Sequence, residues 1–506
     1  MLKRRCIMLI SCVILFQAYW WPMFGVDLQN THLMSGKGAM TASPVQKWIY
    51  TGSSNDWGET GVSAYDVNRD GFTDVLTAFW SGGVDAVRGS NGTRTWAANI
   101  SDAWNSVPAV KDVNGDGVNE VFVGSWGNGN LYCLNGNTGA VLWSAPTGSS
   151  TCESSPKVAD LDNDGAYEVV VGAWGGYLLC ANAITGAQEW LVNLGNDINH
   201  APAVANLNAD PALEVVVGSG STLNCRDGAT GAAQWSASLA GSFGWASPLI
   251  ADVDNDGALE VVASAGGVLY IYSASGVLER QVSLSSSSNS SPAAANLDAD
   301  PALEIVVGSS NNLYCVDGAT GAIQWTYSVG SECHRGPAIA DINGDNALEV
   351  IVPNRGSQLL CLRANGSLLW SYTAPTTDIH DPAVADIDDD NCLEIVAALA
   401  SGTNNLLALD DPGNTSGCSP VGAEEGAPSP SLRLAPTASG FLIVMPQAAR
   451  VKLSLYDPSG RLVRRLYDGE LGEGKHIFAI GGIAPGVYVG VLEHPGGTLT
   501  AKITAR

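Results

Sequence analysis

The residues best suited to chemistry in this 506-residue chain are acidic side chains at fixed spacing in one short loop. Asp160, Asp162, Asp164 and Glu168 stand at positions 1, 3, 5 and 9 of that loop, and Gly165 permits a sharp turn. Carboxylate oxygens that converge in this way suit a hard cation, most often calcium. The loop runs directly into an apolar segment typical of a strand, so it is not an EF-hand.

The same loop occurs eight times along the chain. Its copies begin at Asp66, Asp112, Asp160, Asn206, Asp252, Asn296, Asp341 and Asp386, with spacings of 44 to 48 residues. A period of this length indicates a repeat architecture in which each unit packs on its neighbours. A single acidic loop could be a solvated turn, but eight copies in phase, each followed by a strand, favour metal binding.

Six of the eight loops are predicted to hold calcium in structural sites. The loops at Asn206 and Asn296 are weaker candidates, because Asn replaces the first acid and Pro211 or Pro301 replaces the turn glycine. Proline fixes φ at about −65° and cannot form a left-handed turn. The predicted ligands are Asp66, Asn68, Asp70, Asp74, Asp112, Asn114, Asp116, Glu120, Asp160, Asp162, Asp164, Glu168, Asp252, Asp254, Asp256, Glu260, Asp341, Asn343, Asp345, Glu349, Asp386, Asp388, Asp390 and Glu394.

Each loop belongs to a unit of four short strands. In the sixth unit these are expected at residues 291–295, 305–308, 312–316 and 322–327. Short β-rich runs broken by Gly and Asx turns predict an antiparallel blade, and a ring of blades is a β-propeller. The eighth unit lacks its fourth strand, which the segment around Trp48 can supply. The sequence therefore predicts an all-β protein with an eight-bladed propeller over residues 46–411.

Two motifs of these units resemble known propeller repeats. The loop Asp252-Val-Asp-Asn-Asp-Gly-Ala-Leu-Glu260 resembles FG-GAP repeats, in which positions 1, 3, 5 and 9 bind calcium. The turns that lead to Trp143 and Trp235, and the opening Trp21-Pro-Met-Phe, resemble pyrroloquinoline-quinone-like propellers. Quinoprotein dehydrogenases pair adjacent cysteines with a cofactor-bound calcium. No Cys-Cys pair occurs here, which argues against that activity.

The segments outside the propeller predict export. Residues 1–20 have the basic start and apolar run of a secretory signal peptide, although a lipoprotein cleavage box ending at Cys12 is an alternative. Residues 21–45 are expected to form an irregular N-terminal segment. Residues 412–430 have a linker composition, and residues 431–506 alternate as in a small Ig-like β-sandwich. No transmembrane span is expected in the mature chain.

The C-terminal domain resembles a known sorting signal. Leu455-Tyr-Asp-Pro-Ser-Gly-Arg-Leu-Val463 and Gly486-Val-Tyr488 are similar to the FlgD-like domain that serves as a type A signal for type IX secretion. The resemblance implies contact with the secretion machinery and delivery to the outside or outer surface of a bacterial cell. It leaves open whether this domain is removed.

Charge and cysteine content narrow the class of protein further. The formal net charge of −26 argues against nucleic acid as a partner, and 26 of the 50 acidic residues stand at ligand positions of the eight loops. Bound divalent ions would offset part of that charge. Five cysteines occupy equivalent places in successive units and are expected in the core, so no disulfide framework is predicted: Cys133, Cys180, Cys225, Cys315 and Cys361.

Residues that do not repeat fall in the turns on the face opposite the acidic loops. Aromatic rings beside polar groups suit stacking on a sugar or gripping a peptide. The same tryptophans could instead pack between blades and fill the central channel. The candidate ligand-binding residues are Trp57, Trp80, Trp104, Trp126, Trp174, Trp245, His334 and Arg335.

The sequence therefore predicts an exported, surface-displayed, calcium-binding propeller that binds an extracellular glycan or protein ligand. The alternative is a calcium-dependent polysaccharide lyase, in which His200, His334, Arg335 and His380 would act as base and charge neutraliser. No catalytic residue is assigned, and catalysis is the less favoured interpretation. The chain contains no nucleophile elbow, phosphate-binding loop or zinc-ligand spacing.

Overall fold

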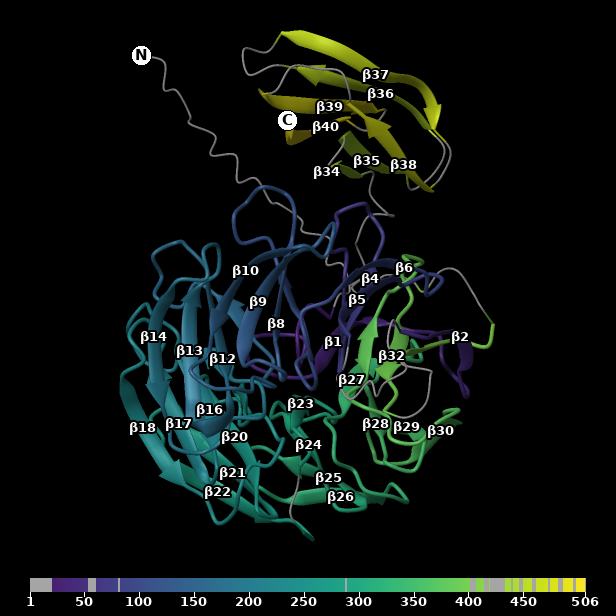
Figure 1. Cartoon of the computed structure of the whole chain (residues 1–506). Coiled ribbons are helices and arrows are strands. Elements are labelled where there is room, and N and C mark those ends of the chain that lie inside the picture. The colour runs from purple at the N-terminus through teal and green to yellow at the C-terminus, as the bar shows by residue number, and fades with distance from the viewer. Residues whose placement is uncertain are drawn as a thin grey trace, which may run out of the picture.

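The computed structural model is almost entirely built of strands (Figure 1). It describes residues 21–52, 61–80, 82–286, 289–400, 406–413 and 418, and from residue 433 onward the segments 433–437, 440–445, 449–456, 461–471, 474–480, 486–494 and 497–505. The expected signal peptide lies outside the described residues. Within them, no helix is long and apolar enough to cross a membrane, and the one helical element is the short 3-10 turn η1 (Trp174–Gly176).

The described part of the repeat region forms eight antiparallel sheets, numbered here 1 to 8 in chain order. Sheets 1 to 4 consist of β3 (Val62–Tyr65), β4 (Asp74–Phe79), β5 (Gly83–Arg88) and β6 (Arg94–Ala98); β7 (Ala109–Lys111), β8 (Glu120–Gly124), β9 (Asn130–Asn135) and β10 (Val141–Pro146); β11 (Lys157–Ala159), β12 (Glu168–Gly172), β13 (Tyr177–Asn182) and β14 (Gln188–Asn193); and β15 (Ala203–Ala205), β16 (Glu214–Ser219), β17 (Thr222–Asp227) and β18 (Ala233–Ser238).

The later sheets repeat the same order of strands. Sheets 5 to 8 consist of β19 (Leu249–Ala251), β20 (Glu260–Ala265), β21 (Val268–Ser273) and β22 (Leu278–Ser283); β23 (Ala293–Ala295), β24 (Glu304–Ser309), β25 (Asn312–Asp317) and β26 (Ile323–Ser328); β27 (Ala338–Asp341), β28 (Glu349–Pro353), β29 (Gln358–Arg363) and β30 (Leu368–Thr373); and β31 (Ala383–Ala385), β32 (Glu394–Ala398), β33 (Leu406–Asp410) and β2 (Val45–Tyr50).

The position of each strand within its sheet follows its hydrophobic pattern. The second strand, such as β24, is buried on both faces and reads as a continuous apolar run. The fourth strand, such as β26, alternates exposed and half-buried side chains, as expected at an outer edge. First strands of neighbouring sheets contact each other, so they form the innermost layer. These observations confirm the all-β propeller architecture that the repeat predicts.

A tryptophan at the same position of several outer strands forms a hydrogen bond with the next sheet. The indole N–H of Trp96 donates to the carbonyl of Gly136 at 2.7 Å, and that of Trp190 donates to Gly228 at 2.7 Å. Glycine is required in these turns because a Cβ on Gly139, where φ is 69°, would lie 2.5 Å from the Trp96 ring. In the same way Trp48 of β2 donates to Gly89 of sheet 1 at 2.6 Å.

The expectation of an irregular N-terminal segment is wrong in part, because residues 21–37 line the inside of sheets 1 to 7. Successive carbonyls of this segment accept hydrogen bonds from the middle residues of six first strands: Ala64, Val110, Val204, Ile250, Ala294 and Ile339. The segment ends in β1 (Leu33–Lys37), which pairs in parallel with β27. The inner edges of the first strands carry N–H groups that need partners, and this segment supplies them.

The C-terminal strands form two further sheets around a separate core (Figure 1). One sheet contains β34 (Arg433–Thr437), β35 (Gly440–Met445) and β38 (Gly474–Ala479), and the other contains β36 (Ala449–Tyr456), β37 (Leu462–Leu471), β39 (Gly486–His494) and β40 (Gly497–Ala505). Phe441 of β35 is buried against Leu453 of β36 and Leu492 of β39. Two sheets with one apolar layer between them are a sandwich arrangement.

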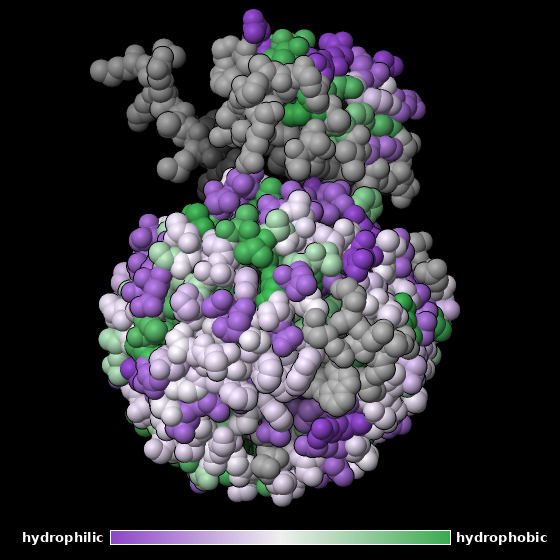
Figure 2. Space-filling view, viewed as in Figure 1, coloured by the Kyte–Doolittle hydropathy of each residue, from purple (hydrophilic) through white to green (hydrophobic). Residues whose placement is uncertain are grey.

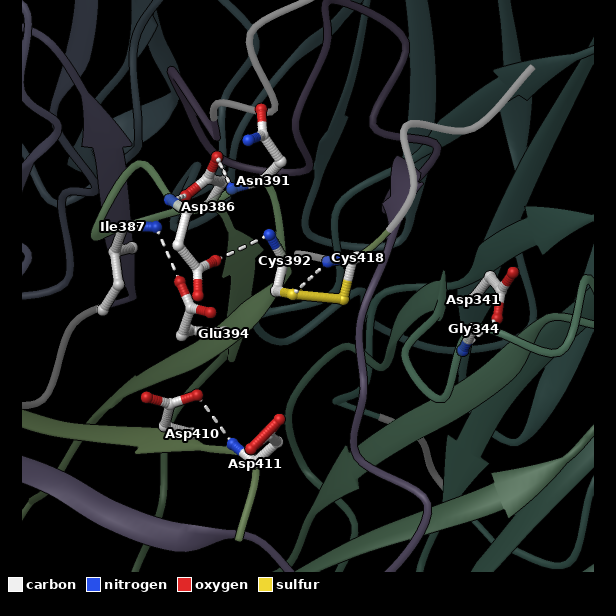
Figure 3. The surroundings of a disulfide bond; sticks show 11 residues. Asp341, Gly344, Asp386, Ile387, Asn391, Cys392, Glu394, Asp410, Asp411 and Cys418 are labelled. Atoms are coloured by element: carbon white, nitrogen blue, oxygen red, sulfur yellow. Dashed lines mark hydrogen bonds between the residues drawn. A yellow bond between two sulfur atoms is a disulfide. The ribbon is translucent and has the colours of Figure 1, made fainter. Parts of the chain in front are cut away.

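One cysteine expectation is wrong, since Cys392 and Cys418 form a disulfide with a Cα–Cα distance of 5.0 Å (Figure 3). Cys392 occupies position 7 of the acidic loop of sheet 8, and Cys418 belongs to the expected linker. The prediction placed Cys418 in the linker and considered no partner for it, whereas this pair joins the linker to an acidic loop. The five repeat cysteines are free and buried, as expected.

Removing this disulfide is expected to weaken the attachment of the chain that follows β33. The bridge closes 26 residues, and a loop of that size stabilises a fold by about 3 kcal/mol. The double variant C392S/C418S should therefore unfold at a lower denaturant concentration than the oxidised wild type, measured by fluorescence. The wild type in reductant should match the variant. Equal midpoints for all three samples would show that the bridge does not stabilise the fold.

Candidate metal loops and a tryptophan-lined pocket

The acidic loops are folded by the same carboxylates that are candidates for metal binding. In the loop of sheet 3, the Asp160 carboxylate accepts the backbone N–H groups of Asp164 and Gly165 at 3.1 and 3.0 Å. Asn163 and Gly165 adopt φ values of 60° and 92°, which is where Asn and Gly are tolerated. Positions 4 and 6 of the loop are therefore set by backbone geometry, and positions 1 and 9 by hydrogen bonding.

The acid at position 9 is buried in every loop, and in the seven loops where it is glutamate it bonds the backbone of position 2. Glu168 Oε2 accepts the N–H of Leu161 at 2.7 Å, and Glu260 Oε2 accepts that of Val253 at 2.8 Å. The same bond forms in the loops closed by Glu120, Glu214, Glu304, Glu349 and Glu394. These side chains begin the second strands, so their burial is a consequence of the sheet itself.

Burial makes these carboxylates poor anions in the absence of a cation. Desolvation, followed by neighbouring carboxylates, raises the pKa of Glu168 and of Glu260 to about 7. The pKa of Glu349 is raised to about 8 for the same reasons. In sheet 8, Asp388 Oδ1 and Glu394 Oε1 are buried without a hydrogen-bond partner. A divalent cation would supply the missing positive charge, so these residues fit a metal site.

Four loops bring three carboxylates close enough to share an ion, with ligand atoms within 4.8 Å of one another. Three of these groups belong to the predicted set, and the fourth lies in the Asn296 loop, which the sequence rated as weaker. In that loop Asn296 Nδ2 donates to the Asp300 carbonyl at 2.6 Å, so asparagine holds the turn in place of the first acid. The groups are Asp160, Asp162 and Glu168; Asp252, Asp254 and Glu260; Asp386, Asp388 and Glu394; and Asp298, Asp300 and Glu304.

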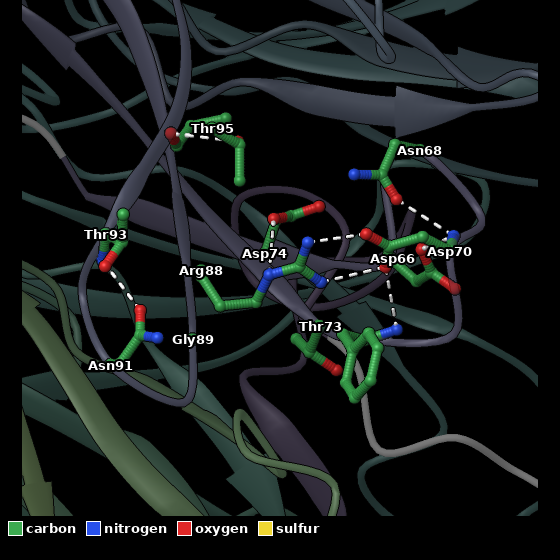
Figure 4. A network of polar contacts seen from close by, with 12 residues as sticks. Asp66, Asn68, Asp70, Thr73, Asp74, Arg88, Gly89, Asn91, Thr93 and Thr95 are labelled. Carbon is green, nitrogen blue, oxygen red and sulfur yellow. Dashed lines mark hydrogen bonds and ion pairs between the residues drawn. The ribbon is translucent and has the colours of Figure 1, made fainter. Parts of the chain in front are cut away.

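Five loops contain a cation that the protein itself supplies. In the first loop, Arg88 Nη1 lies 2.8 Å from Asp70 Oδ1, and Arg88 Nε lies 3.9 Å from Asp74 (Figure 4). Burial alone would raise the pKa of Asp70, but Arg88 more than offsets it, so the pKa is lowered. The other pairs are Arg69 with Asp112, Arg280 with Asp254, Lys37 with Asp341, and Lys47 with Asp388.

The presence or absence of these basic residues distinguishes loops that have similar acidic motifs in the sequence. Within the described chain, no lysine or arginine forms an ion pair with the loop that begins at Asp160. The asparagines at position 3 also differ from acids, because Asn114 and Asn343 donate their amide N–H groups to Glu120 and Glu349. The loop at Asp160 therefore combines four acids with the least internal neutralisation.

Four candidate tryptophans on the opposite face contact one another. The ring of Trp126 lies 5.2 Å from Trp80, 5.9 Å from Trp104 and 6.3 Å from Trp174, measured between centroids. All four rings are half-buried, and they come from sheets 1 to 3. This cluster of Trp80, Trp104, Trp126 and Trp174 is called the tryptophan cluster below. Trp57 lies outside the described residues.

A pocket lies where the turns between sheets surround the central axis. Trp245, His200, His334 and Arg335 line it, together with Asn105, Asn199 and Asn289. Trp245 is 41% exposed, whereas both histidines are buried. Burial lowers the pKa of His200 to about 4, so its imidazole is neutral. The pocket is polar with one exposed aromatic ring, a combination that suits a sugar better than an apolar ligand.

Glu153 connects this pocket to the tryptophan cluster. Its buried carboxylate accepts the indole N–H of Trp174 at 2.8 Å and the amide N–H of Asn105, a pocket residue, at 3.4 Å. Burial raises the pKa of Glu153. The structure thus joins seven of the eight predicted ligand-binding residues into one face, while Trp57 remains a prediction.

Sequence reasoning missed Asp378, which the structure places beside His334. His334 Nε2 lies 3.0 Å from Asp378 Oδ1, and Arg355 Nε lies 3.4 Å from Asp378 Oδ2. Asp378 stands two residues before His380, which the sequence did single out, so an Asp-x-His pattern in this turn was the available signal. An imidazole oriented by a carboxylate can act as a general base.

In the space-filling view, apolar residues on the visible face form small separate patches (Figure 2). Several exposed apolar side chains stand at the starts of outer strands, including Val141, Leu142, Leu278, Ile323 and Leu368. Isolated apolar side chains of this kind are normal on a protein surface.

Comparison with known families agrees with this architecture. A family model described as "Outer membrane protein assembly factor BamB" matches residues 164–341 and 219–459, together more than half of the chain. The chain belongs to this family of repeat propellers. A model described as "FG-GAP-like repeat" matches residues 112–171, which include the loops at Asp112 and Asp160. The predicted resemblance to propeller repeats is confirmed, and the C-terminal resemblance stays a prediction.

Solved structures show the same fold at low identity. A quinohemoprotein alcohol dehydrogenase from Comamonas testosteroni has a TM-score of 0.59 and 14% identity, covering 77% of this chain and 80% of that one. A second such enzyme, from Pseudomonas putida HK5, gives 0.60 and 15%, covering 83% of each chain. BamB from Moraxella catarrhalis gives 0.52 and 16%, covering 72% of this chain and 97% of that one. Identities this low establish fold alone.

Curated relatives at higher identity match only a short segment. Lambda-carrageenases from Pseudoalteromonas carrageenovora and another Pseudoalteromonas are each 30% identical over 96 residues. The match covers 17% of this chain and 10% of the length of those proteins. The match is compatible with a repeat propeller, and it is too short to assign the activity of those proteins to this chain.

The buried glutamates predict a specific pH dependence in metal-free protein. A folded-state pKa of about 7 for Glu168 exceeds the ordinary value of 4.5, so the fold retains a proton that the unfolded chain releases. The stability of the wild type relative to E168Q should therefore fall as pH rises from about 4.5 to 7, then level off. Comparison with E168Q cancels the titration of His32, His200 and Lys157, whose pKa values burial lowers.

Urea unfolding at several pH values, after exhaustive removal of divalent ions, measures this difference. Adding a saturating divalent cation should remove the trend, because the ion stabilises the ionised carboxylate. A relative stability that rises between pH 4.5 and 7 would contradict a desolvated Glu168.

Proposed function

We propose that this protein is an exported, calcium-stabilised β-propeller that binds an extracellular ligand through its tryptophan-bearing face. The observation that carries the proposal is the tryptophan cluster joined through Glu153 to a polar pocket. Half-buried aromatic rings beside amide and imidazole groups suit recognition of a carbohydrate, with a peptide as the other ligand class.

The propeller is inferred to be a closed ring of eight blades followed by an Ig-like domain. Two contacts support closure. β2 pairs with β33, so the N-terminal strand completes the eighth sheet, and Trp48 of β2 then docks on Gly89 of sheet 1. The C-terminal sandwich is proposed to act as the sorting domain for secretion machinery, with the signal peptide, linker and domain boundaries as predicted from the sequence. The mature protein would then be secreted or displayed on the outer surface of a bacterium.

Calcium is the proposed ion because every candidate ligand is an oxygen and the loops repeat at ligand positions typical of this metal. Extracellular sites of this kind often bind at about 10⁻⁴ to 10⁻³ M. Each site would stabilise the fold by up to about 2.7 kcal/mol when calcium reaches a hundred times its Kd. Loops that already contain Arg or Lys should bind more weakly, and the loop at Asp160 is proposed to bind first.

Calcium removal should therefore lower the melting temperature, and restoring Ca²⁺ should raise it more than restoring Mg²⁺ does. Mg²⁺ demands octahedral geometry and retains its water, so the same loop should hold it less well. The variant D160N/D162N should lose part of the calcium-dependent rise. D70N is the control, because Asp70 is already paired with Arg88, and its effect should be equal with and without calcium. A melting temperature that calcium does not change would rule out this role.

Ligand binding is tested by truncating two rings of the tryptophan cluster. The variant W126A/W174A should lose binding to any glycan that the wild type selects on an array, because its stacking surface is removed. W143A is the matched control: it also removes a half-buried ring, but one that lies on outer strand β10 and donates to the Ala183 carbonyl. Retained binding by W126A/W174A, with a native melting temperature, would show that these rings only fill space.

A polysaccharide lyase is the second candidate function, favoured by the Asp378–His334 pair beside the pocket. The short match to lambda-carrageenases is compatible with action on a polysaccharide. A lyase would leave an unsaturated sugar, so ultraviolet absorbance should increase when an acidic polysaccharide is added. Absorbance that stays constant with a glycan that binds would favour the binding module.

A further inference from the structure

Arg335 is an arginine without a carboxylate partner in a protein that carries 50 acidic residues. Among the described residues, no Asp or Glu lies within ion-pair distance of its guanidinium, although Arg88, Arg280 and Arg355 are all paired. Arg335 lines the polar pocket, and its Nε is buried without a hydrogen-bond partner. We propose that Arg335 binds an anionic substituent of the ligand, so that the glycan recognised is an acidic one. This inference rests on the proposed glycan-binding function.

The backbone around Arg335 is held in place from two sides. Ser290 Oγ donates to the Arg335 carbonyl at 2.8 Å, and the N–H of Gly336 donates to Asp381 Oδ1 at 2.8 Å. Its Nη2 lies 3.5 Å from His380 Nε2, which occupies one of five guanidinium N–H groups. No described residue accepts from the other N–H groups of the guanidinium, whose planar shape is well suited to a carboxylate or sulfate.

The acidic groups nearest to Arg335 feel its charge but form their ion pairs and hydrogen bonds with other residues. Asp378 forms ion pairs with His334 and Arg355, and these two groups together with the charge of Arg335 more than offset burial and lower its pKa. Asp381 accepts from the backbone of Gly336, and Glu153 accepts from Trp174 and Asn105. None of the three carboxylates lies within ion-pair distance of Arg335, so its guanidinium can bind an anionic group of a ligand.

The same region could suggest a metal site, since His334, Asp378 and His380 place ligand atoms within 4.8 Å of one another. The arginines argue against it. Arg335 lies against His380, and Arg355 against Asp378, so two guanidinium groups contact the atoms that would coordinate a cation. A cluster with two arginines and two histidines is better matched to an anion.

An acidic ligand is compatible with the overall charge of −26. Charges farther away than about 8 Å are largely screened at physiological ionic strength, so the groups that line the pocket dominate. The acidic loops lie between the first and second strands, at the strand ends opposite to the turns that line the pocket, and the proposed calcium ions would offset much of their charge. A sugar ring on Trp245, with its acidic group on Arg335, uses both features of one pocket.

The test compares three oligosaccharide probes with wild type, R335Q and R363Q, by calorimetry. The probes are oligogalacturonate, a sulfated galacto-oligosaccharide and a neutral galacto-oligosaccharide of equal length. R363Q is the matched control because Arg363 is exposed, and the substitution removes the same charge far from the pocket. Unchanged melting temperatures will confirm that both variants are folded.

The wild type should bind at least one acidic probe about tenfold or more tightly than the neutral probe. R335Q should lose that preference while keeping its neutral-probe affinity, and R363Q should behave as the wild type. The uronate and sulfate arms show which anion is preferred. Equal affinity for acidic and neutral probes, or a preference unchanged in R335Q, would overturn the inference and leave the proposed function standing. Binding of none of the three probes by the wild type would overturn the inference and count against glycan binding as well.

Discussion

The structure depends on one buried interaction, the bond from the carboxylate at loop position 9 to the backbone N–H at position 2. It fixes the acidic loop to the start of the second strand, which is buried along its whole length. The bond requires a carboxylate where burial disfavours its charge, as the raised pKa of Glu168 shows. The geometry of each sheet therefore buries a carboxylate that a nearby positive charge would stabilise.

The repeats differ in whether a basic side chain of the protein neutralises the acidic loop. In sheet 1 the cation is Arg88, the last residue of the third strand of the same sheet, so the loop is neutralised as the protein folds. In sheet 3 the corresponding residue is Asn182, and among the described residues no lysine or arginine pairs with this loop. One basic residue at the end of the third strand can thus take the place that a bound cation would occupy, as Arg88 does in sheet 1.

The sequence was sufficient for the features that repeat, since period, alternation and turn residues all reflect local constraints. The four strands of each unit and the docking of outer tryptophans, such as Trp96 on Gly136, follow from them. Contacts that occur only once in the fold, and not in every repeat unit, could not be inferred from the sequence. The disulfide of Cys392 with Cys418 and the path of residues 21–37 along the inner strands depend on how segments distant in sequence pack against the sheets. Asp378 was missed because its role requires His334, which is distant in sequence.

The acidic loops and the pocket are built from different turns of the propeller. The acidic loops are tied into the second strands, so substitutions there disturb the sheets, whereas the turns on the other face carry residues such as Trp126 and Arg335 that no repeat constraint requires. Each blade contributes a turn to the same central pocket, so one residue changed in one blade alters the pocket directly. Arg335 illustrates the point: its blade supplies the unpaired charge, and neighbouring blades supply His200 and Trp245. The specificity of the proposed ligand site would therefore come from the combination of turns, and the stability of the sheets from the acidic loops at the other ends of their strands.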